Sequence, residues 1–525
     1  MGNGAMVAGA LWRETWRKTW LPGALLCALA IAIRLLVATR REGIESDGIA
    51  YLQNATALFA NWREVNVLHP PLYSLLLAPF LGVWNDPEWT ARVLSAVLGG
   101  LWIWPTLWLA DETTDEAVLW TAGLLVALTP SAIEASTKVL AEATFGLCLT
   151  LFLFVLVRTL RVGSWGLAVA TGILGGLSTL ARPEGMAYLA LAWVLLILAP
   201  ALFGSLWTRR LVLARLAIVT VCWIAIVSPY MALVRSHTGH WHWSGKGGVS
   251  LVFGESVGDE QQASFYERRL AELRSEDVPS GVLAYALAHP GAMAKRVAIN
   301  LHLIDKYVIS SLLAGGGFAL LVLGIVQLRF RRPPGPPEWI LAVVPLPLAG
   351  VLVYLVDARY FVSLIPVFAI LGGIGLARLP AAGGSPRGRL SRRSLLWLTL
   401  VLISFVPWIV RPWFRQDPAA VEKAAGMWLR RTGGPKVPFI GSYGSAIYYT
   451  ESHAIPFALH SLESLIQAGR RAGVRYLLAD NYRLPQSRPD LAGLLGEKPP
   501  ASPDLELVHR VEDRAGRRIL IYRIR

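Results

Sequence analysis

The chain has 525 residues, of which 54% are hydrophobic and 16% are charged, and its mean hydropathy is +0.48. This composition excludes an ordinary soluble domain and indicates a polytopic membrane protein surrounded by membrane lipids. A net charge of +15 would suit a nucleic-acid-binding protein, but the basic residues cluster in short loops between apolar runs, so we expect no nucleic acid partner.

Eleven apolar stretches approach the roughly 20 residues that a helix needs to cross the hydrocarbon core. They lie near residues 20–39, 89–110, 117–133, 139–157, 164–181, 186–204, 211–234, 308–328, 339–356, 360–377 and 394–410. A shorter stretch at 69–84 opens close to two prolines and is predicted to be a re-entrant or interfacial helix. We therefore predict an all-α polytopic membrane protein with eleven transmembrane helices plus juxtamembrane helices.

The basic residues also predict the orientation of the chain. Placing the N-terminus in the cytoplasm puts most of the loop arginines inside, including Arg209, Arg210, Arg329 and Arg331, and leaves few in the short outer loops. The expected location is the cytoplasmic (plasma) membrane, with the segment after residue 410 outside.

The sequence changes character after residue 410. Residues 1–410 are predicted to form the membrane domain, with outer loops at 40–88 and 235–306, and residues 411–525 to form a small extracytoplasmic α/β domain. We expect helices at 261–277, 419–431 and 461–473, and strands at 436–441, 474–480, 505–511 and 517–525.

The first outer loop places acids next to the membrane. If Ser46 caps a helix, Asp47, Tyr51 and Asn54 share one of its faces. Glu45 and Asp47 then lie at the positive end of the helix dipole, which favours an ionised carboxylate. Such a carboxylate can take a proton from an acceptor hydroxyl. Ordinary helix capping explains the same spacing, so spacing alone leaves both interpretations open.

The motif His69-Pro70-Pro71-Leu72-Tyr73 follows in the same loop. Its two prolines fix an extended entry and a helix start, which places His69 and Tyr73 at a rigid rim. A purely structural turn is the alternative.

Two short outer loops carry arginines at helix ends. Arg182 and Glu184 lie between the fifth and sixth apolar stretches, and charges at membrane depth are candidates for function because they are costly. An ion pair between these two residues, or snorkelling, is the alternative. Arg359 lies beside Tyr360, and its guanidinium fork matches the oxygens of a phosphate. Interfacial anchoring explains this pair equally well.

A third outer segment contains three histidines and a lysine. His237, His240 and His242 lie close together, but no acid lies among them, so a divalent metal is a minor alternative and we expect no cofactor. Lys246 is a candidate contact for an anion.

Taken in order, these segments resemble a known family. An acid followed by a tyrosine in the first outer loop, then "HPPLY", "ARVLSAVLGG", "VLAE", "LARPEG" and "RYF", resembles the glycosyltransferase family 39 and aminoarabinose-transferase-like membrane glycosyltransferases of the GT-C fold. The ordered series covers most of residues 1–380.

The resemblance implies an inverting transferase that moves a sugar from a polyprenyl-phosphate donor to a glycan, lipid or protein hydroxyl on the outer face of the membrane. It assigns the catalytic acid to Asp47. Family members commonly carry two adjacent acids in this loop, whereas Gly48 follows Asp47 here, so Glu45 is the nearest second acid.

The resemblance also implies positions around the substrate. Glu142, in "VLAE", and His69 match positions near the cavity, and Arg182 and Arg359 match arginines expected to bind the donor phosphate.

Two other kinds of function are alternatives to a transferase. A secondary transporter or lipid flippase would be expected to show repeated halves and charges near the membrane midplane, whereas the candidate charges cluster at one face. A lipid-linked glycan ligase or polymerase shares the donor chemistry and stays an alternative.

Overall fold

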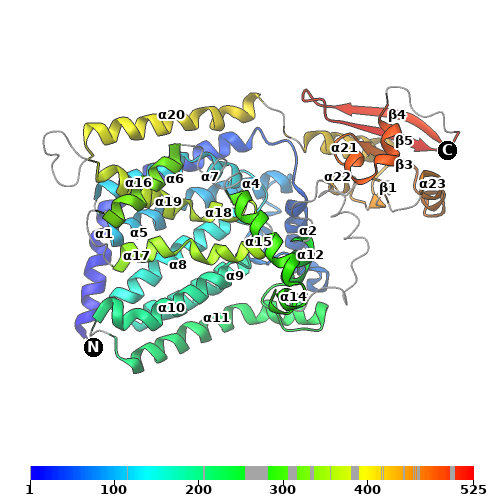
Figure 1. The fold of residues 1–525 in the computed structure, drawn as a ribbon. Coiled ribbons are helices and arrows are strands. Elements are labelled where there is room, and N and C mark those ends of the chain that lie inside the picture. The colour runs from blue at the N-terminus through cyan, green and yellow to red at the C-terminus, as the bar shows by residue number, and fades with distance from the viewer. Residues whose placement is uncertain are drawn as a thin grey trace. The chain divides into compact units, whose positions relative to one another are not determined.

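The computed structural model forms two compact units (Figure 1). It describes residues 2–114, 116–204, 207–254, 282–304, 316–330, 336–354, 356–379, 390–414, 417, 419–441, 444–452, 454–455, 457, 461–496 and 503–525. The first unit consists of Met1–Ala38, Tyr51–Gly247 and Asn300–Val410, and the second of Thr39–Ala50, Gly248–Ile299 and Arg411–Arg525. The helix expected at 261–277 lies outside the described residues.

Most of the chain before residue 415 is helical (Figure 1). The α-helices are α1 (Gly2–Ala38), α2 (Ser46–Ala60), α3 (Leu72–Leu77), α4 (Pro87–Gly100), α5 (Ile103–Thr113), α6 (Glu116–Leu128), α7 (Pro130–Ala135), α8 (Glu142–Val162), α9 (Trp165–Ala181), α10 (Gly185–Phe203), α11 (Arg209–Thr238), α12 (Gly247–Phe253), α14 (Val282–Ala288), α15 (Pro290–Ile304), α16 (Gly316–Phe330), α17 (Pro336–Val343), α18 (Ala358–Phe361), α19 (Ile365–Ala377) and α20 (Arg392–Phe414). Short 3-10 helices lie at η1 (Trp62–Glu64), η2 (Ala78–Phe80), η7 (Leu346–Val353) and η8 (Val362–Leu364).

The predicted membrane helices are present as helices. Within the described residues, seven are long and apolar enough to span a membrane: Trp20–Ala38, Pro87–Glu112, Glu142–Val162, Gly185–Phe203, Arg209–Thr238, Ala358–Ala377 and Arg392–Phe414. Shorter apolar helices lie at Glu116–Leu128, Trp165–Ala181, Gly317–Gln327 and Pro337–Val353. Every predicted stretch overlaps one of these helices, which confirms a multi-pass, helical membrane domain; the count of eleven crossings stays a prediction.

Glycines let α9 and α11 pack closely. A Cβ added to Gly172 would lie 2.6 Å from the Cβ of Cys222, and one added to Gly176 would lie 2.7 Å from the Cβ of Ile226. The two glycines are four residues apart and therefore lie on the same face of α9, as in other closely packed membrane helices.

Arg34 in α1 is fully buried and faces the protein. Its guanidinium donates to the carbonyls of Val126 at 3.2 Å and Ala127 at 3.1 Å. These carbonyls belong to the last turn of α6, where a cation is stabilising because the helix dipole is negative there. Arg34 therefore ties α1 to the end of α6.

The C-terminal part of the second unit contains a mixed five-stranded sheet in the order β2-β1-β3-β5-β4. β1 (Phe439–Ile440) pairs in parallel with β2 (Ala454–Ile455) and β3 (Tyr476–Asp480), and β5 (Arg518–Ile524) pairs antiparallel with β3 and β4 (Leu505–Glu512). The helices are α21 (Ala420–Gly433), α22 (Ala446–Thr450), α23 (Leu462–Arg471), α24 (Leu484–Ser487) and the 3-10 helix η9 (Pro489–Leu495).

Alternate residues of β3 enter different hydrophobic cores, as the two-residue period of a strand requires. Leu477 packs with Leu465 of α23, whereas Leu478 packs with Val421 of α21. The sheet thus lies between α21 and α23, and the predicted α/β fold of the C-terminal part is confirmed, while its bounds at 411–525 and its place outside the membrane stay predictions.

Candidate active site

The helix predicted in the first outer loop forms as α2, with Asp47 in its first turn. The amide of Ile49 donates to the carbonyl of Glu45 at 3.2 Å. The side chains of Glu45 and Asp47 are half-buried. Asp47 therefore lies at the start of a helix and is partly exposed.

The predicted polar face of α2 packs against the chain that follows it. The ring of Tyr51 lies edge-on to His69 and to Tyr73, with centroids 5.1 Å and 5.3 Å away. Asn54 donates to the carbonyl of Asn66 at 3.0 Å and accepts from its amide at 2.7 Å. These contacts bring Tyr51, His69 and Tyr73 together, as a common site requires.

Tyr73, the third member of this group, is fully buried. Its hydroxyl donates to the carbonyl of Ala91 at 3.0 Å and lies 2.8 Å from the hydroxyl of Ser95. Burial raises the pKa of Tyr73, and the nearby Glu142 adds to the increase, while the hydrogen bond with Ser95 opposes it. Tyr73 is therefore a buried, hydrogen-bonded member of this cluster.

Arg182, which follows α9, lies between two carboxylates. Its Nη1 is 2.6 Å from Oε1 of Glu142, and its Nη2 is 3.0 Å from Oε1 of Glu184. Arg182 and Glu142 are only 8% and 3% exposed. Burial would lower the pKa of Arg182, but Glu184 and Glu142 raise it well above its usual value. The pair with Glu184 left open by the sequence is thus present, together with a second pair that local spacing did not reveal.

Tyr360 joins the two predicted phosphate-binding arginines. The guanidinium carbon of Arg182 lies 5.0 Å from the centroid of the Tyr360 ring, and that of Arg359 lies 5.7 Å from it. Arg359 is the more exposed arginine, and its Nε lies 4.0 Å from Oδ2 of Asp357. Two segments far apart in sequence therefore present their arginines around one aromatic ring.

Lys246 belongs to the same electrostatic cluster. Burial raises the pKa of Glu184, but the charges of Arg182 and Lys246 and hydrogen bonds lower it below its usual value overall. The backbone of the Lys246 loop is held by close packing, since a Cβ on Gly245 would lie 2.4 Å from the carbonyl oxygen of Val67. The loop thereby packs on the segment that leads into His69.

Of the three histidines in this segment, His237 contacts backbone carbonyls. Nε2 of His237 lies 2.9 Å from the carbonyl oxygen of Arg63, and Nδ1 lies 3.0 Å from that of Leu233. No group of three His, Cys, Asp or Glu residues in the described part of the chain could hold a metal ion.

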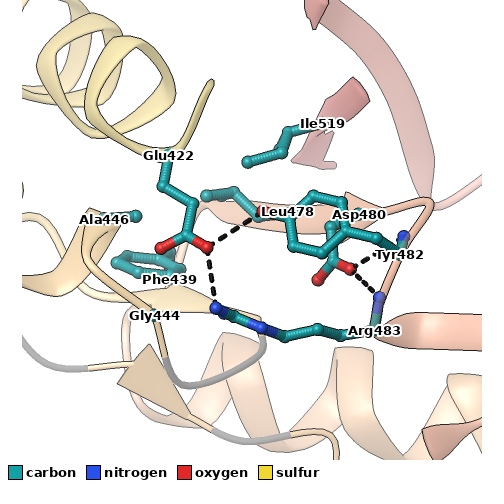
Figure 2. Close-up of a pocket in the computed structure, with 9 residues that line it drawn as sticks. All are labelled: Glu422, Phe439, Gly444, Ala446, Leu478, Asp480, Tyr482, Arg483 and Ile519. Carbon is teal, nitrogen blue, oxygen red and sulfur yellow. Dashed lines mark hydrogen bonds and ion pairs between the residues drawn. The ribbon is translucent and has the colours of Figure 1, made fainter. Parts of the chain in front are cut away.

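A separate small pocket lies in the C-terminal domain (Figure 2). Oε1 of Glu422 accepts from the Tyr482 hydroxyl at 3.0 Å and lies 2.8 Å from Nη2 of Arg483, and Oε2 accepts from the Ser445 hydroxyl at 2.7 Å. Asp480 accepts from backbone amides that follow it. The polar groups of the pocket satisfy one another, so this network holds α21 to the sheet and we assign it no ligand.

Comparisons with known proteins agree with this picture. Residues 68–232 match the family model described as dolichyl-phosphate-mannose-protein mannosyltransferase, which is less than half of the chain. Among curated proteins, no sequence matches.

Solved structures share the fold over most of the chain. Cupriavidus metallidurans ArnT bound to undecaprenyl phosphate is similar with a TM-score of 0.60 and 15% identity, covering 95% of this chain and 97% of that one. Archaeoglobus fulgidus oligosaccharyltransferase AglB, in complex with an inhibitory peptide and a dolichol-phosphate, is similar with a TM-score of 0.57 and 14% identity, covering 89% of this chain and 70% of that one.

These matches confirm the resemblance predicted from the ordered motifs. The fold class is that of the GT-C membrane glycosyltransferases, with a small α/β domain at the C-terminal end.

Proposed function

We propose that the protein is an inverting glycosyltransferase that moves a sugar from a polyprenyl-phosphate donor to an acceptor hydroxyl. The observation that carries this proposal is the convergence of Arg182, Glu142, Tyr360, Arg359 and Lys246 in one unit, although they come from four separate segments of the chain. The lipid phosphates bound to the similar ArnT and AglB structures support a lipid phosphate as part of the donor.

In the proposed reaction Asp47 is the general base. It takes the proton of the acceptor hydroxyl, whose oxygen attacks the anomeric carbon from the face opposite the phosphate. The bond from the anomeric carbon to the phosphate oxygen breaks, and polyprenyl phosphate leaves with the electron pair. Attack from the opposite face inverts the anomeric configuration.

Positive charge near the donor stabilises the departing phosphate. Arg359 and Lys246 are our choices for this contact, because Arg359 is partly exposed and Lys246 is half-buried. Arg182 is almost completely buried between Glu142 and Glu184, so its main proposed role is to hold Tyr360 and thereby the neighbouring Arg359.

We place the reaction on the outer face of the cytoplasmic membrane, with the N-terminus cytoplasmic and the C-terminal domain outside. The excess of arginine in the opposite loops supports this orientation. The acceptor class is a glycan, a lipid or a protein.

Reconstitution tests the proposal directly. The purified protein in liposomes is incubated with a panel of radiolabelled polyprenyl-phosphate sugars and an envelope extract, and Asp47→Asn is compared with Glu45→Gln. We expect transfer with release of lipid phosphate in wild type and a loss of about 100-fold or more in Asp47→Asn, whereas a smaller loss in Glu45→Gln would show that Glu45 assists as the second acid. Equal turnover by Asp47→Asn would remove Asp47 as the base. Movement of labelled lipid across the bilayer without donor consumption would replace the transferase by a transporter.

A further inference from the structure

The loop that leads into α2 belongs to the same compact unit as the C-terminal domain. The guanidinium carbon of Arg40 lies 5.5 Å from the centroid of the Trp413 ring, within the range of a cation–π contact. The amide of Glu42 donates to Oδ2 of Asp417 at 3.2 Å. These contacts join segments that are 375 residues apart.

Gly43 makes the closest approach between these segments. A Cβ at this position would lie 2.4 Å from the Cβ of Ala419 and 2.7 Å from its carbonyl oxygen. Real Cβ atoms do not approach that closely, so a side chain at residue 43 must displace one of the two segments. Glycine therefore permits the backbone contact at this point.

Asp417 fixes both segments with one carboxylate. Its Oδ1 accepts from the amide of Ala419 at 3.1 Å, just before α21 begins, while its Oδ2 accepts from Glu42. The loop held in this way enters α2 within a few residues, and Asp47 lies in the first turn of that helix.

We propose that Trp413, Asp417 and Ala419 form a brace through which the C-terminal domain positions Asp47 for catalysis. This inference rests on the proposed role of Asp47 as the base. Displacing a reacting group by about 1 Å can lower a rate by about 100-fold, so the contact has a kinetic consequence. Asp417 is a positioning residue, because it acts on the reaction only through the loop.

Two substitutions of Asp417 test the brace. Asp417→Asn keeps one acceptor oxygen for the two amides of Ala419 and Glu42, so one of the two hydrogen bonds is lost. Asp417→Ala removes both acceptors. Asp490→Ala is the matched control, because Asp490 belongs to the same domain and pairs with its neighbour Arg488.

Sugar transfer is measured first. We expect Asp417→Asn and Asp417→Ala to lower kcat similarly, by about tenfold to 100-fold, with the donor KM unchanged and the control at the wild-type rate. If hydrogen exchange shows residues 39–50 loosened in Asp417→Asn or Asp417→Ala while that variant transfers sugar as fast as wild type, the contact has no kinetic role and the brace is refuted.

A combined variant tests whether the effect passes through Asp47. The double variant Asp47→Asn/Asp417→Asn should be no slower than Asp47→Asn alone, because the position of residue 47 no longer affects the rate once the base is absent. Multiplying losses would contradict the proposal, since they indicate damage elsewhere.

Hydrogen exchange gives a readout independent of activity. Amides of residues 39–50 should exchange faster in Asp417→Asn than in wild type or in Asp490→Ala. Unchanged exchange would refute the contact itself. If wild type transfers no sugar at all, the proposed function fails and the role of the brace in catalysis fails with it, while the exchange result still decides whether the contact exists.

Discussion

Arg182 and Glu142 form a buried ion pair, with Nη1 2.6 Å from Oε1, although 40 residues separate them in the chain. Glu184 adds a second carboxylate to the same guanidinium at 3.0 Å. The positive charge of Arg182 is therefore compensated within the protein before any donor binds. In the proposed reaction, the donor phosphate would therefore be attracted chiefly by the neighbouring cations, Arg359 and Lys246.

The cluster of Arg182, Glu142 and Glu184 predicts how strongly substitutions of its members destabilise the protein. We expect Arg182→Gln to lower the free energy of unfolding by about 3–5 kcal/mol, because it leaves two carboxylates uncompensated in a buried place. Glu142→Gln should cost less, since the pair between Arg182 and Glu184 persists. Thermal unfolding in detergent measures both, and a larger loss for Glu142→Gln would contradict the arrangement. Arg182→Gln/Glu142→Gln should recover part of the loss of the arginine variant, because the two residues contact each other.

The two half-buried cations, Arg359 and Lys246, predict a different phenotype. Arg359→Gln and Lys246→Gln should each raise the donor KM by about tenfold, with little change in Tm. A tenfold change corresponds to the free energy of about one hydrogen bond to a charged group. Arg359→Lys should restore only part of the affinity, because lysine lacks the planar fork. KM for the labelled donor and Tm are measured on the same preparations. A fall in Tm with an unchanged KM would show that these residues are structural.

Local patterns in the sequence predict the elements of this fold better than its contacts. Hydropathy finds the membrane helices because apolar length is a property of one segment, and short apolar runs bounded by turn residues find β3, β4 and β5 for the same reason. β2 has two residues, too few to show a pattern. The pair of Arg182 with Glu142 and the contact of Glu42 with Asp417 join distant segments, so no spacing reveals them.

The site shows the same limit. The ordered motifs select Arg182, Tyr360 and Arg359, which do meet in space, but they do not show that Arg182 is enclosed by acids. Tyr73 is selected as a rim residue, yet it is fully buried, because its helix turns that side chain toward α4.

Tyr73 should therefore tolerate loss of its hydroxyl. Because burial raises the pKa of Tyr73, we expect the phenol to stay neutral at every pH below its ordinary pKa and somewhat above it, and to take no part in proton transfer. Tyr73→Phe is expected to keep the transfer rate and the whole pH profile of wild type, and to lose about 1 kcal/mol of stability with its hydrogen bonds. The pH profile of kcat and thermal unfolding check this. A lost alkaline limb in Tyr73→Phe would instead make the hydroxyl part of the chemistry.

Glu184 predicts how the stability of the site depends on pH. Burial raises the pKa of Glu184, but the charge of Arg182, hydrogen bonds and the charge of Lys246 together lower it by more. The pKa in the folded state therefore lies below the pKa in the unfolded state. A group of this kind stabilises the folded state at pH values above its unfolded pKa of about 4.3, and the contribution disappears as pH falls through the folded pKa. The Tm difference between wild type and Glu184→Gln should thus be constant from neutral pH down to about pH 5 and shrink below about pH 4.

Glu463→Gln, which changes an exposed acid on α23, is the control and should alter Tm little at any of these pH values. A difference that grew toward acidic pH would mean that Glu184 is stabilised as the neutral acid, and the ion pair with Arg182 would then not be the interaction that holds this loop.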